Sequence, residues 1–248
     1  MNGAPTDSVS DRSVFVTGAS GYIGQRLVPA LLRRGHAVKC LVRPRAATSA
    51  ARMLGECEII TGNPLDAASF AERVAPASTF VQLVGAPHPA PWKAAAFAAI
   101  DLPAGLAGLA AARAARARHF VYLSVAQPAP VMRAYQSARA AVESELRQAA
   151  SSDGMAVTIL RPWYVLGPGR QWPGLFSPLY RILEGIPATR ALALRTGLVD
   201  LHDLIASMVA TIESPPFGVR ILDVPAIRNA ARATEATPGA PTQATTKV

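Results

Sequence analysis

Long apolar runs, cysteines and clustered histidines are all scarce in this chain of 248 residues. The most alanine-rich stretch, residues 94–117, carries Asp101 and Arg113, which argues against a membrane span. The two cysteines, Cys40 and Cys57, lie in or beside apolar strand-like runs, and the four histidines are scattered. The sequence therefore predicts buried free thiols, and neither a disulfide nor a metal site.

The amino terminus and the charge exclude further classes. Residues 1–11 have neither a basic start nor an apolar stretch, so no signal peptide is expected and the predicted location is the cytoplasm. The net charge of +9 suggests a nucleic-acid partner. However, several arginines close predicted helices, where a cation complements the helix dipole, and no basic run is interleaved with aromatic residues. We therefore expect a solvated basic surface that helps attract a phosphorylated ligand, and not nucleic-acid binding.

Apolar strands alternate with helices along most of the chain. The strands are apolar almost throughout, as a parallel sheet covered on both faces requires. This order predicts an α/β fold with a doubly wound, mostly parallel Rossmann sheet. The expected strands are residues 14–17, 37–42, 57–61, 79–84, 119–124 and 156–161, and the expected helices are 22–34, 66–74, 92–117 and 134–150.

The chain reads as one domain, residues 12–228, after a flexible segment 1–11. Its last part, about 162–225, is too short for a separate domain and is predicted to form a small cap. Residues 229–248 are rich in Ala, Thr and Pro without periodicity, so a disordered tail is expected. Within the cap we expect helices at 179–183 and 198–212, with Asp200 or Asp203 as an N-cap, and a strand at 219–224.

Three glycines, Gly18, Gly21 and Gly24, separate the first strand from the first helix. In a strand–turn–helix unit such glycines allow a tight turn, close approach of a pyrophosphate, and close packing of helix on strand. The N–H groups and dipole of the helix start then bind the phosphates. The segment thus predicts a dinucleotide site made by Gly18, Ala19, Ser20, Gly21, Tyr22, Ile23 and Gly24.

The residue after the second strand bears on which dinucleotide is bound. Asp or Glu there bonds the ribose 2′-hydroxyl of NAD, but this chain has Arg43, with Arg45 two residues later. A guanidinium can hold a 2′-phosphate through charge-assisted hydrogen bonds. We therefore expect NADP(H) in preference to NAD(H), with an arginine pair that merely ends a strand as the alternative.

Several segments in order resemble the atypical and extended short-chain dehydrogenase/reductases, in particular the small NAD(P)-binding group near NmrA-like proteins and complex I accessory subunits. The resemblance covers about residues 12–225. The segments that carry it are Thr17–Gly24, Gly62–Asp66, Gln82–Gly85, Val121–Ser124 and Leu160–Gly169.

The resemblance implies roles for further residues. Asn63, Pro64, Val84 and Gly85 would contact adenine and ribose, and Pro162 and Trp163 would lie on the nicotinamide side. Family catalysis uses a Ser or Thr, a Tyr, and a Lys four residues after the Tyr, and residues i and i+4 share a helix face. The matching residues here are Ser124, Tyr135 and Arg139, so arginine replaces the lysine.

The sequence departs from the family at two further positions, because an acidic residue is more usual at the position of Asn63 and Asp101 lies where Asn is usual in the long helix. Trp163, Tyr164 and Trp172 either line an apolar substrate pocket or pack the cap onto the sheet.

Three functions stay open at this stage. The first is an NADP(H)-dependent reductase of a small apolar carbonyl or enone. The second is a non-catalytic NADP(H)-binding regulator, redox sensor or assembly factor with a protein partner, and it is motivated by Arg139 and the small cap. The third, a nucleotide-sugar epimerase or dehydratase, is disfavoured because the C-terminal region is small. Homo-oligomerisation through the alanine-rich helix is a further alternative, although a buried helix needs no partner.

Overall fold

A seven-stranded parallel sheet organises the computed structural model, which describes residues 12–87, 89–129, 131–169 and 187–235. The strand order is β3-β2-β1-β4-β5-β6-β9, and all neighbouring strands are parallel. This confirms the predicted doubly wound fold. The strands are β1 (Ser13–Thr17), β2 (Ala37–Val42), β3 (Glu58–Thr61), β4 (Thr79–Gln82), β5 (His119–Leu123), β6 (Ala156–Leu160) and β9 (Val219–Leu222).

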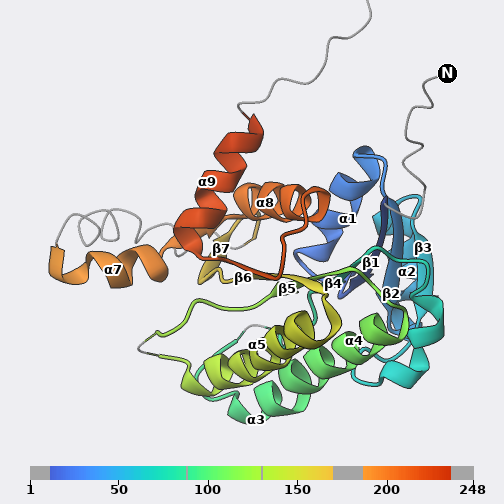
Figure 1. The fold of residues 1–248 in the computed structure, drawn as a ribbon, viewed down its shortest axis with the longest axis horizontal. Coiled ribbons are helices and arrows are strands. Elements are labelled where there is room, and N and C mark those ends of the chain that lie inside the picture. Colours follow the sequence, from blue (N-terminus) through green and yellow to red (C-terminus); the bar gives the residue numbers. More distant parts are fainter. Residues whose placement is uncertain (1–11, 88, 130, 170–186, 236–248) are drawn as a thin grey trace, which may run out of the picture.

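Helices cover both faces of this sheet (Figure 1). One layer contains α1 (Gly24–Arg33), α8 (Leu201–Glu213) and α9 (Val224–Glu235), and α8 contacts both of the others. The opposite layer contains α3 (Ala94–Ala96), α4 (Leu102–Ala114) and α5 (Arg133–Asp153), with α4 packed on α5. Two more α-helices occur among the described residues, α2 (Ala47–Leu54), which the sequence analysis missed, and α7 (Pro187–Arg195).

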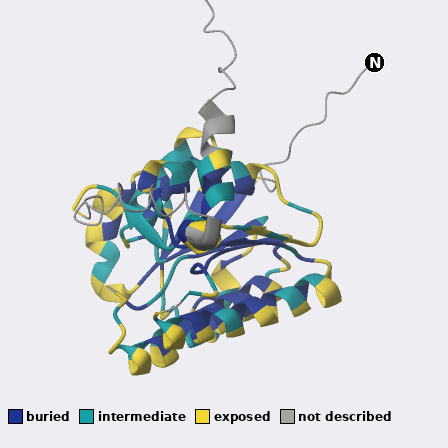
Figure 2. Ribbon diagram, turned by 90° about the vertical axis from the view of Figure 1, so that its left-hand side faces the viewer, coloured by how far each residue is buried: buried dark blue, intermediate teal, exposed yellow. Residues whose placement is uncertain are grey.

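Apolar side chains fill the space between the sheet and each helix layer, and the buried residues of the helices face the sheet (Figure 2). On the α4–α5 side, Phe15, Phe80 and Phe120 occupy the same register position on β1, β4 and β5. Their rings stack at centroid separations of 5.3 and 5.2 Å, and all three are fully buried. This ladder fixes the three strands whose carboxyl ends carry the candidate site.

The long alanine-rich helix is interrupted. A π-helical turn, Phe97–Asp101, joins α3 to α4, and Pro103 stands in the first turn of α4. Proline cannot donate the helical hydrogen bond to the fourth residue before it, which favours an irregular turn at this place. Small residues let α4 pack closely, since a Cβ on Gly105 would lie 2.4 Å from Val142 of α5.

The segment Ala94–Ala114 is long and apolar enough to cross a membrane, and 44% of its most apolar window is buried. Because α4 packs on α5 and on the sheet within the chain, we interpret this segment as a core helix.

Two short 3₁₀ turns, Ala67–Ser69 and Ala71–Arg73, replace the predicted helix at 66–74. The Ser69 hydroxyl bonds to the carbonyl groups of Asn63 and Asp66, which competes with helical bonding. Asp66 caps the first turn by accepting from the N–H of Ala68. Between the turns, Phe70 leaves the helical conformation and buries its ring in the core.

The C-terminal part is more closely joined to the sheet than predicted. The predicted strand at 219–224 is β9, which pairs with β6 in the main sheet. Residues 198–200 form a strand instead of helix: β8 (Leu198–Asp200) pairs with β7 (Tyr164–Leu166). Asp200 is the N-cap of α8, as predicted, and accepts from the N–H of His202 at 2.7 Å.

The expected tail boundary is wrong, because α9 continues to Glu235. The predicted helix at 179–183 and Trp172 lie outside the described residues.

Candidate functional site

The strand order places a topological switch point between β1 and β4, which neighbour each other while the chain continues in opposite directions from them. Ligands of such sheets bind outside the carboxyl ends of the strands at this point. Gly18 follows β1 with φ of +72°, and a Cβ there would lie 3.1 Å from the backbone of Leu83 and Val84. The loop after β1 therefore touches the loop after β4 at the switch point. Only glycine fits at position 18 of this turn.

The turn leads directly into the amino terminus of α1. Gly24 is buried, and a Cβ on it would lie 2.4 Å from the Ala19 carbonyl oxygen and 2.5 Å from that of Gly18. Gly21 is exposed, and its N–H donates to the carbonyl of Gly18 at 2.9 Å. The N-cap residue Ile23 makes no side-chain capping hydrogen bond, and the first turn of α1 contains no acidic side chain. This helix end fits the pyrophosphate of a dinucleotide, because its N–H groups and dipole favour an anion there.

The other predicted residues of the turn differ in exposure. Ala19 is fully buried, whereas Ser20 is half-buried. Tyr22 is half-buried, with the guanidinium carbon of Arg26 4.7 Å from its ring centroid. A Cβ on Gly167 would lie 2.3 Å from the Tyr22 hydroxyl, so the turn is packed against the loop that follows β7. Tyr22 thus joins the turn between β1 and α1 to the C-terminal part of the chain.

Arg43, Asn63 and Pro64 follow β2 and β3 and so lie at the same sheet edge. Arg43 has an extended backbone and an exposed side chain directly after β2. The Asn63 side chain is exposed, and its Oδ1 accepts the N–H of Leu65 at 3.1 Å. Its carboxamide oxygen is therefore engaged in a local turn, which leaves the amide N–H₂ as the group that could donate to a ligand.

Tyr135 stands in the first turn of α5, at the carboxyl edge of the sheet. The residue is half-buried. Its ring lies 4.8 Å from that of Phe97 at an interplanar angle of 48°, and the Arg139 guanidinium carbon lies 5.1 Å from the Tyr135 ring centroid. The packing orients the ring while leaving part of the residue accessible, which suits a group that exchanges a proton with a substrate.

Ser124 is directed to a different partner. Its hydroxyl donates to Oε1 of Glu143 at 2.6 Å, and Ser124 is only 4% exposed. Glu143 is fully buried and also accepts hydrogen bonds from Gln127 at 2.7 Å and from Nε of Arg161 at 3.0 Å. Ser124 therefore belongs to a buried network that ties the end of β5 to α5 and to the end of β6.

Arg147 also contacts Glu143, at 3.0 Å. Burial acts to raise the pKa of the Glu143 carboxyl, but hydrogen bonds from Arg161 and Ser124, with the charges of Arg161 and Arg147, hold that pKa below its usual value. Sequence analysis missed this residue. The signal was the spacing, since Tyr135, Arg139 and Glu143 recur every four residues along one face of α5.

Arg139 is buried under the site. Its Nη2 lies 2.6 Å from Oδ1 of Asp101, and its Nη1 donates to the Leu123 carbonyl at 2.5 Å. Two of the departures from the family pattern, Asp101 and Arg139, thus form one ion pair. Close by on β5, burial raises the pKa of Tyr122 to about 12, despite the nearby charge of Arg139.

Val84 and Gly85 follow β4, as the resemblance requires, and both are half-buried. Pro162 is buried, and its carbonyl accepts the N–H of Ala126 at 3.0 Å. Trp163 is partly buried against the apolar cluster under α1 and α8, which is the packing role that we considered for it. Tyr164 lies in β7.

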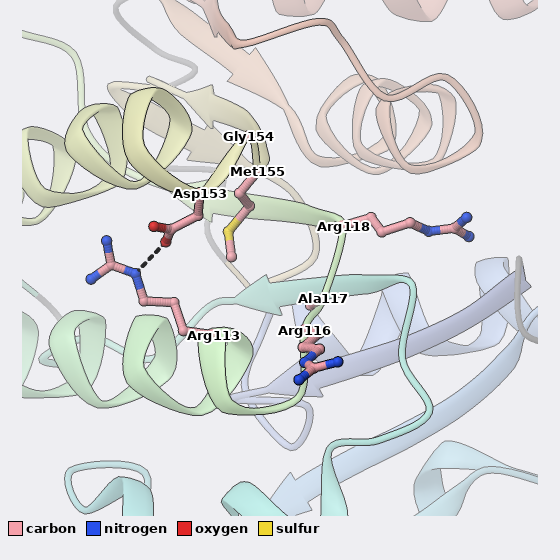
Figure 3. A pocket seen from close by; sticks show the side chains of 7 residues that line it. All are labelled: Arg113, Arg116, Ala117, Arg118, Asp153, Gly154 and Met155. Atoms are coloured by element: carbon pink, nitrogen blue, oxygen red, sulfur yellow. Dashed lines mark hydrogen bonds and ion pairs between the residues drawn. The ribbon is translucent and has the colours of Figure 1, made fainter.

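Metal-ligating groups, thiols and an arginine-lined hollow were also considered among the described residues. No cluster of metal-ligating side chains occurs among them, and Cys40 and Cys57 are free thiols, Cys40 being buried. A hollow lined by Arg113, Arg116 and Arg118 lies before β5 and β6, at the opposite edge of the sheet (Figure 3). In Figure 3 the Arg118 side chain points away from Arg113, so these arginines do not converge on one point.

Comparisons with known proteins give the family and the fold. Residues 14–189 match the model of the NAD dependent epimerase/dehydratase family. A ceramide reductase of Caulobacter vibrioides is 31% identical over 216 residues, which cover 85% of this chain and 64% of the relative. A chloroplastic divinyl chlorophyllide a 8-vinyl-reductase of Oryza sativa subsp. indica is 31% identical over 167 residues, covering 62% of this chain and 40% of the relative.

This chain therefore spans less than two thirds of the length of either relative. Among solved structures, an oxidoreductase of the short chain dehydrogenase/reductase family from Burkholderia thailandensis superposes with a TM-score of 0.65 at 22% identity. The superposition covers 87% of this chain and 92% of that one. At this identity the likeness is one of fold.

Proposed function

Because this chain belongs to the NAD dependent epimerase/dehydratase family, whose model matches residues 14–189, we propose that it is an NADP(H)-dependent reductase of a small apolar carbonyl or enone. The observation that carries the proposal is one sheet edge that holds both the uncapped, acid-free start of α1 and the half-buried Tyr135. The first suits a dinucleotide phosphate, and the second suits proton transfer beside it.

The division of work between cofactor and protein follows from these positions. The nicotinamide cofactor, when bound, supplies the hydride to the substrate carbon. Tyr135 gives its hydroxyl proton to the substrate oxygen, so that a carbonyl becomes an alcohol and the phenolate is reprotonated from solvent. The turn from Gly18 to Gly24 holds the pyrophosphate, and the loop at Val84 and Gly85 supports the adenosine side.

Preference for NADP(H) rests on Arg43. Its exposed guanidinium follows β2, where a carboxylate would repel a 2′-phosphate. Arg45 is exposed two residues later and adds positive charge. The reductase names of the relatives in Caulobacter and rice support reduction as the direction of the reaction.

The test uses the purified full chain. Titration by nucleotide fluorescence should show tighter binding of NADPH than of NADH. NADPH oxidation, followed by absorbance across small apolar aldehydes, ketones and enones, should show turnover that the Y135F variant loses while it still binds NADPH. Tight NADPH binding without turnover on any member of the panel would argue against the reductase.

A non-catalytic NADP(H) sensor is the second candidate, and one specific observation favours it. Ser124 and Arg139, two of the three residues that match the family's catalytic set, are committed to Glu143 and Asp101. A sensor should discriminate between NADPH and NADP⁺ in affinity, or carry a protein partner through purification. Vigorous turnover by the isolated chain, with equal affinity for both forms, would exclude the sensor.

A further inference from the structure

Asp101 and Arg139 together contact four segments at the carboxyl edge of the sheet. Asp101 ends the π-helical turn before α4, and its Oδ2 accepts the N–H of Ala86, beyond β4, at 3.0 Å. Arg139, on α5, donates from Nη1 to the carbonyl of Leu123 at the end of β5. The side chains of Asp101 and Arg139 are 0% and 6% exposed. The pair therefore joins two helices to the ends of two central strands.

The backbone after β4 rests directly on this pair. A Cβ on Gly85 would lie 2.1 Å from Nη2 of Arg139 and 2.8 Å from Oδ1 of Asp101, so no larger residue fits without displacing the pair. Gly85 and its neighbour Val84 belong to the loop expected to contact the cofactor. A movement of the ion pair would thus be transmitted to that loop through contact with its backbone.

The same contacts keep the guanidinium away from a ligand. Nη1 and Nη2 are both engaged, and the guanidinium carbon lies 5.1 Å from the ring centroid of Tyr135 and 5.6 Å from that of Tyr122. To reach a ribose, Arg139 would have to leave Asp101 as an unpaired charge that is fully buried. Such a state is strongly unfavourable, because an unpaired buried charge has lost its hydration without compensation.

We propose that Asp101 and Arg139 form one positioning unit beneath Tyr135 and the loop at Gly85 and Ala86, and that Arg139 does not bind the cofactor. The pair holds the loop at Gly85 and Ala86 against α4, and the guanidinium supports the ring of Tyr135 by a cation–π contact. This inference deepens the proposed function and, for its kinetic part, rests on it. It replaces the ribose-holding role that the family resemblance implies for position 139.

The test removes both charges together. D101L/R139M replaces the ion pair by apolar side chains of similar volume, which avoids an unpaired buried charge. The matched control is R113M/D153L, because Arg113 and Asp153 form an exposed ion pair of 2.6 Å at the other end of α4 and α5 (Figure 3). R139K, which keeps the charge opposite Asp101, serves as the conservative variant should the double variant fold poorly.

The first readout needs no cofactor. Hydrogen exchange at the Ala86 amide, resolved by mass spectrometry of the peptide around residues 83–87, should accelerate at least tenfold in D101L/R139M. It should remain unchanged in R113M/D153L and change less than threefold in R139K. Unchanged exchange in the double variant would show that the pair does not hold this loop, whatever the protein's activity.

The second readout separates binding from turnover. We expect kcat to fall at least tenfold in D101L/R139M, whereas R139K, in which the loop stays held, should bind NADPH within threefold of the wild-type dissociation constant. We expect R139K to recover part of that loss, and the control variant to match wild type in both. A tenfold weaker NADPH affinity in R139K, with exchange at the Ala86 amide as in wild type, would overturn the inference by making Arg139 a cofactor ligand. If wild type itself bound no NADPH, the proposed function would fail, and the exchange result would still decide whether the pair positions the loop.

Discussion

Replacement of the buried Glu143 by Gln should destabilise the protein by about 3 kcal/mol, without changing the size of the side chain. Glu143 is fully buried and its carboxylate accepts from Ser124 at 2.6 Å, Gln127 at 2.7 Å and Arg161 at 3.0 Å. Glutamine cannot pair with the Arg161 charge, and its amide N–H₂ faces donors that already occupy the site.

The magnitude follows from the exposure of the partners. Breaking a buried ion pair costs about 3–5 kcal/mol, since one charge is left buried without its partner. The side chain of Arg161 is 19% exposed, so water partly solvates its charge once the carboxylate is lost. The expected cost therefore lies at the lower end of the range of about 3–5 kcal/mol. Arg147 is 43% exposed and adds little. In a chain of this size a loss of about 3 kcal/mol corresponds to a fall in Tm of about 6–12 °C.

Urea unfolding followed by circular dichroism measures this loss. The control is E145Q on the same helix, because Glu145 is exposed and its replacement should change the free energy of unfolding by less than about 0.5 kcal/mol. A loss below about 1 kcal/mol in E143Q would refute the reasoning, since the carboxylate would then not be the centre of a buried charge network.

The pH dependence gives an independent check on the same residue. The pKa of Glu143 is held below its ordinary value of 4.5 in the folded protein. Its contribution to stability is therefore complete above that value and is lost as the pH falls below it through the depressed pKa. The difference in stability between wild type and E143Q should be constant near neutral pH and shrink in acid. A difference that grows below pH 4.5 would contradict this assignment.

Three further substitutions test other parts of the molecule. R43E should weaken NADPH binding at least tenfold and leave NADH binding within about threefold, as measured by fluorescence titration; an equal loss for both nucleotides would contradict the 2′-phosphate contact. Y135F should abolish turnover with NADPH affinity retained, and residual activity above a tenth of wild type would remove Tyr135 from the proton transfer. Burial, with the charge of Arg220, lowers the pKa of His119 to about 4, so the folded state resists its protonation. Wild type should therefore lose about 3 kcal/mol of stability between pH 6.5 and 4 that H119Q does not lose, and parallel pH curves would refute that cause.

The fold was predictable because its determinants are local or periodic. Continuous apolar strands alternating with helices specify a covered parallel sheet, and the glycines between β1 and α1 specify the turn at the switch point. The interrupted stretch at 66–74 was harder, because its helix-like pattern is overridden by side-chain hydrogen bonds of Ser69 and by burial of Phe70. The pairing of β9 with β6 joins residues about sixty positions apart, which no local pattern encodes.

The sequence predicted which residues lie at the candidate site better than it predicted the side chains that they contact. Sequence spacing placed Tyr135 and Arg139 on one face of α5, and the structure has them there. The partner of Ser124 could not be inferred, because it depends on which part of α5 faces the end of β5 after packing. Glu143 lies nineteen residues from Ser124 in the chain, yet the two are joined by a hydrogen bond of 2.6 Å.

Departures from a family motif have a different meaning when they contact each other. Taken separately, Arg139 is a lost lysine and Asp101 a lost asparagine, and both argue for a degraded site. In the structure their side chains meet at 2.6 Å, with Gly85 leaving the space that the guanidinium occupies. A lysine paired with Asp101 would not fill the space beside Gly85 with a guanidinium. An asparagine at position 101 would leave the buried charge of Arg139 without a counter-charge. The two replacements therefore compensate each other structurally, and the question of catalysis moves from Arg139 to whether Tyr135 alone completes the proton transfer.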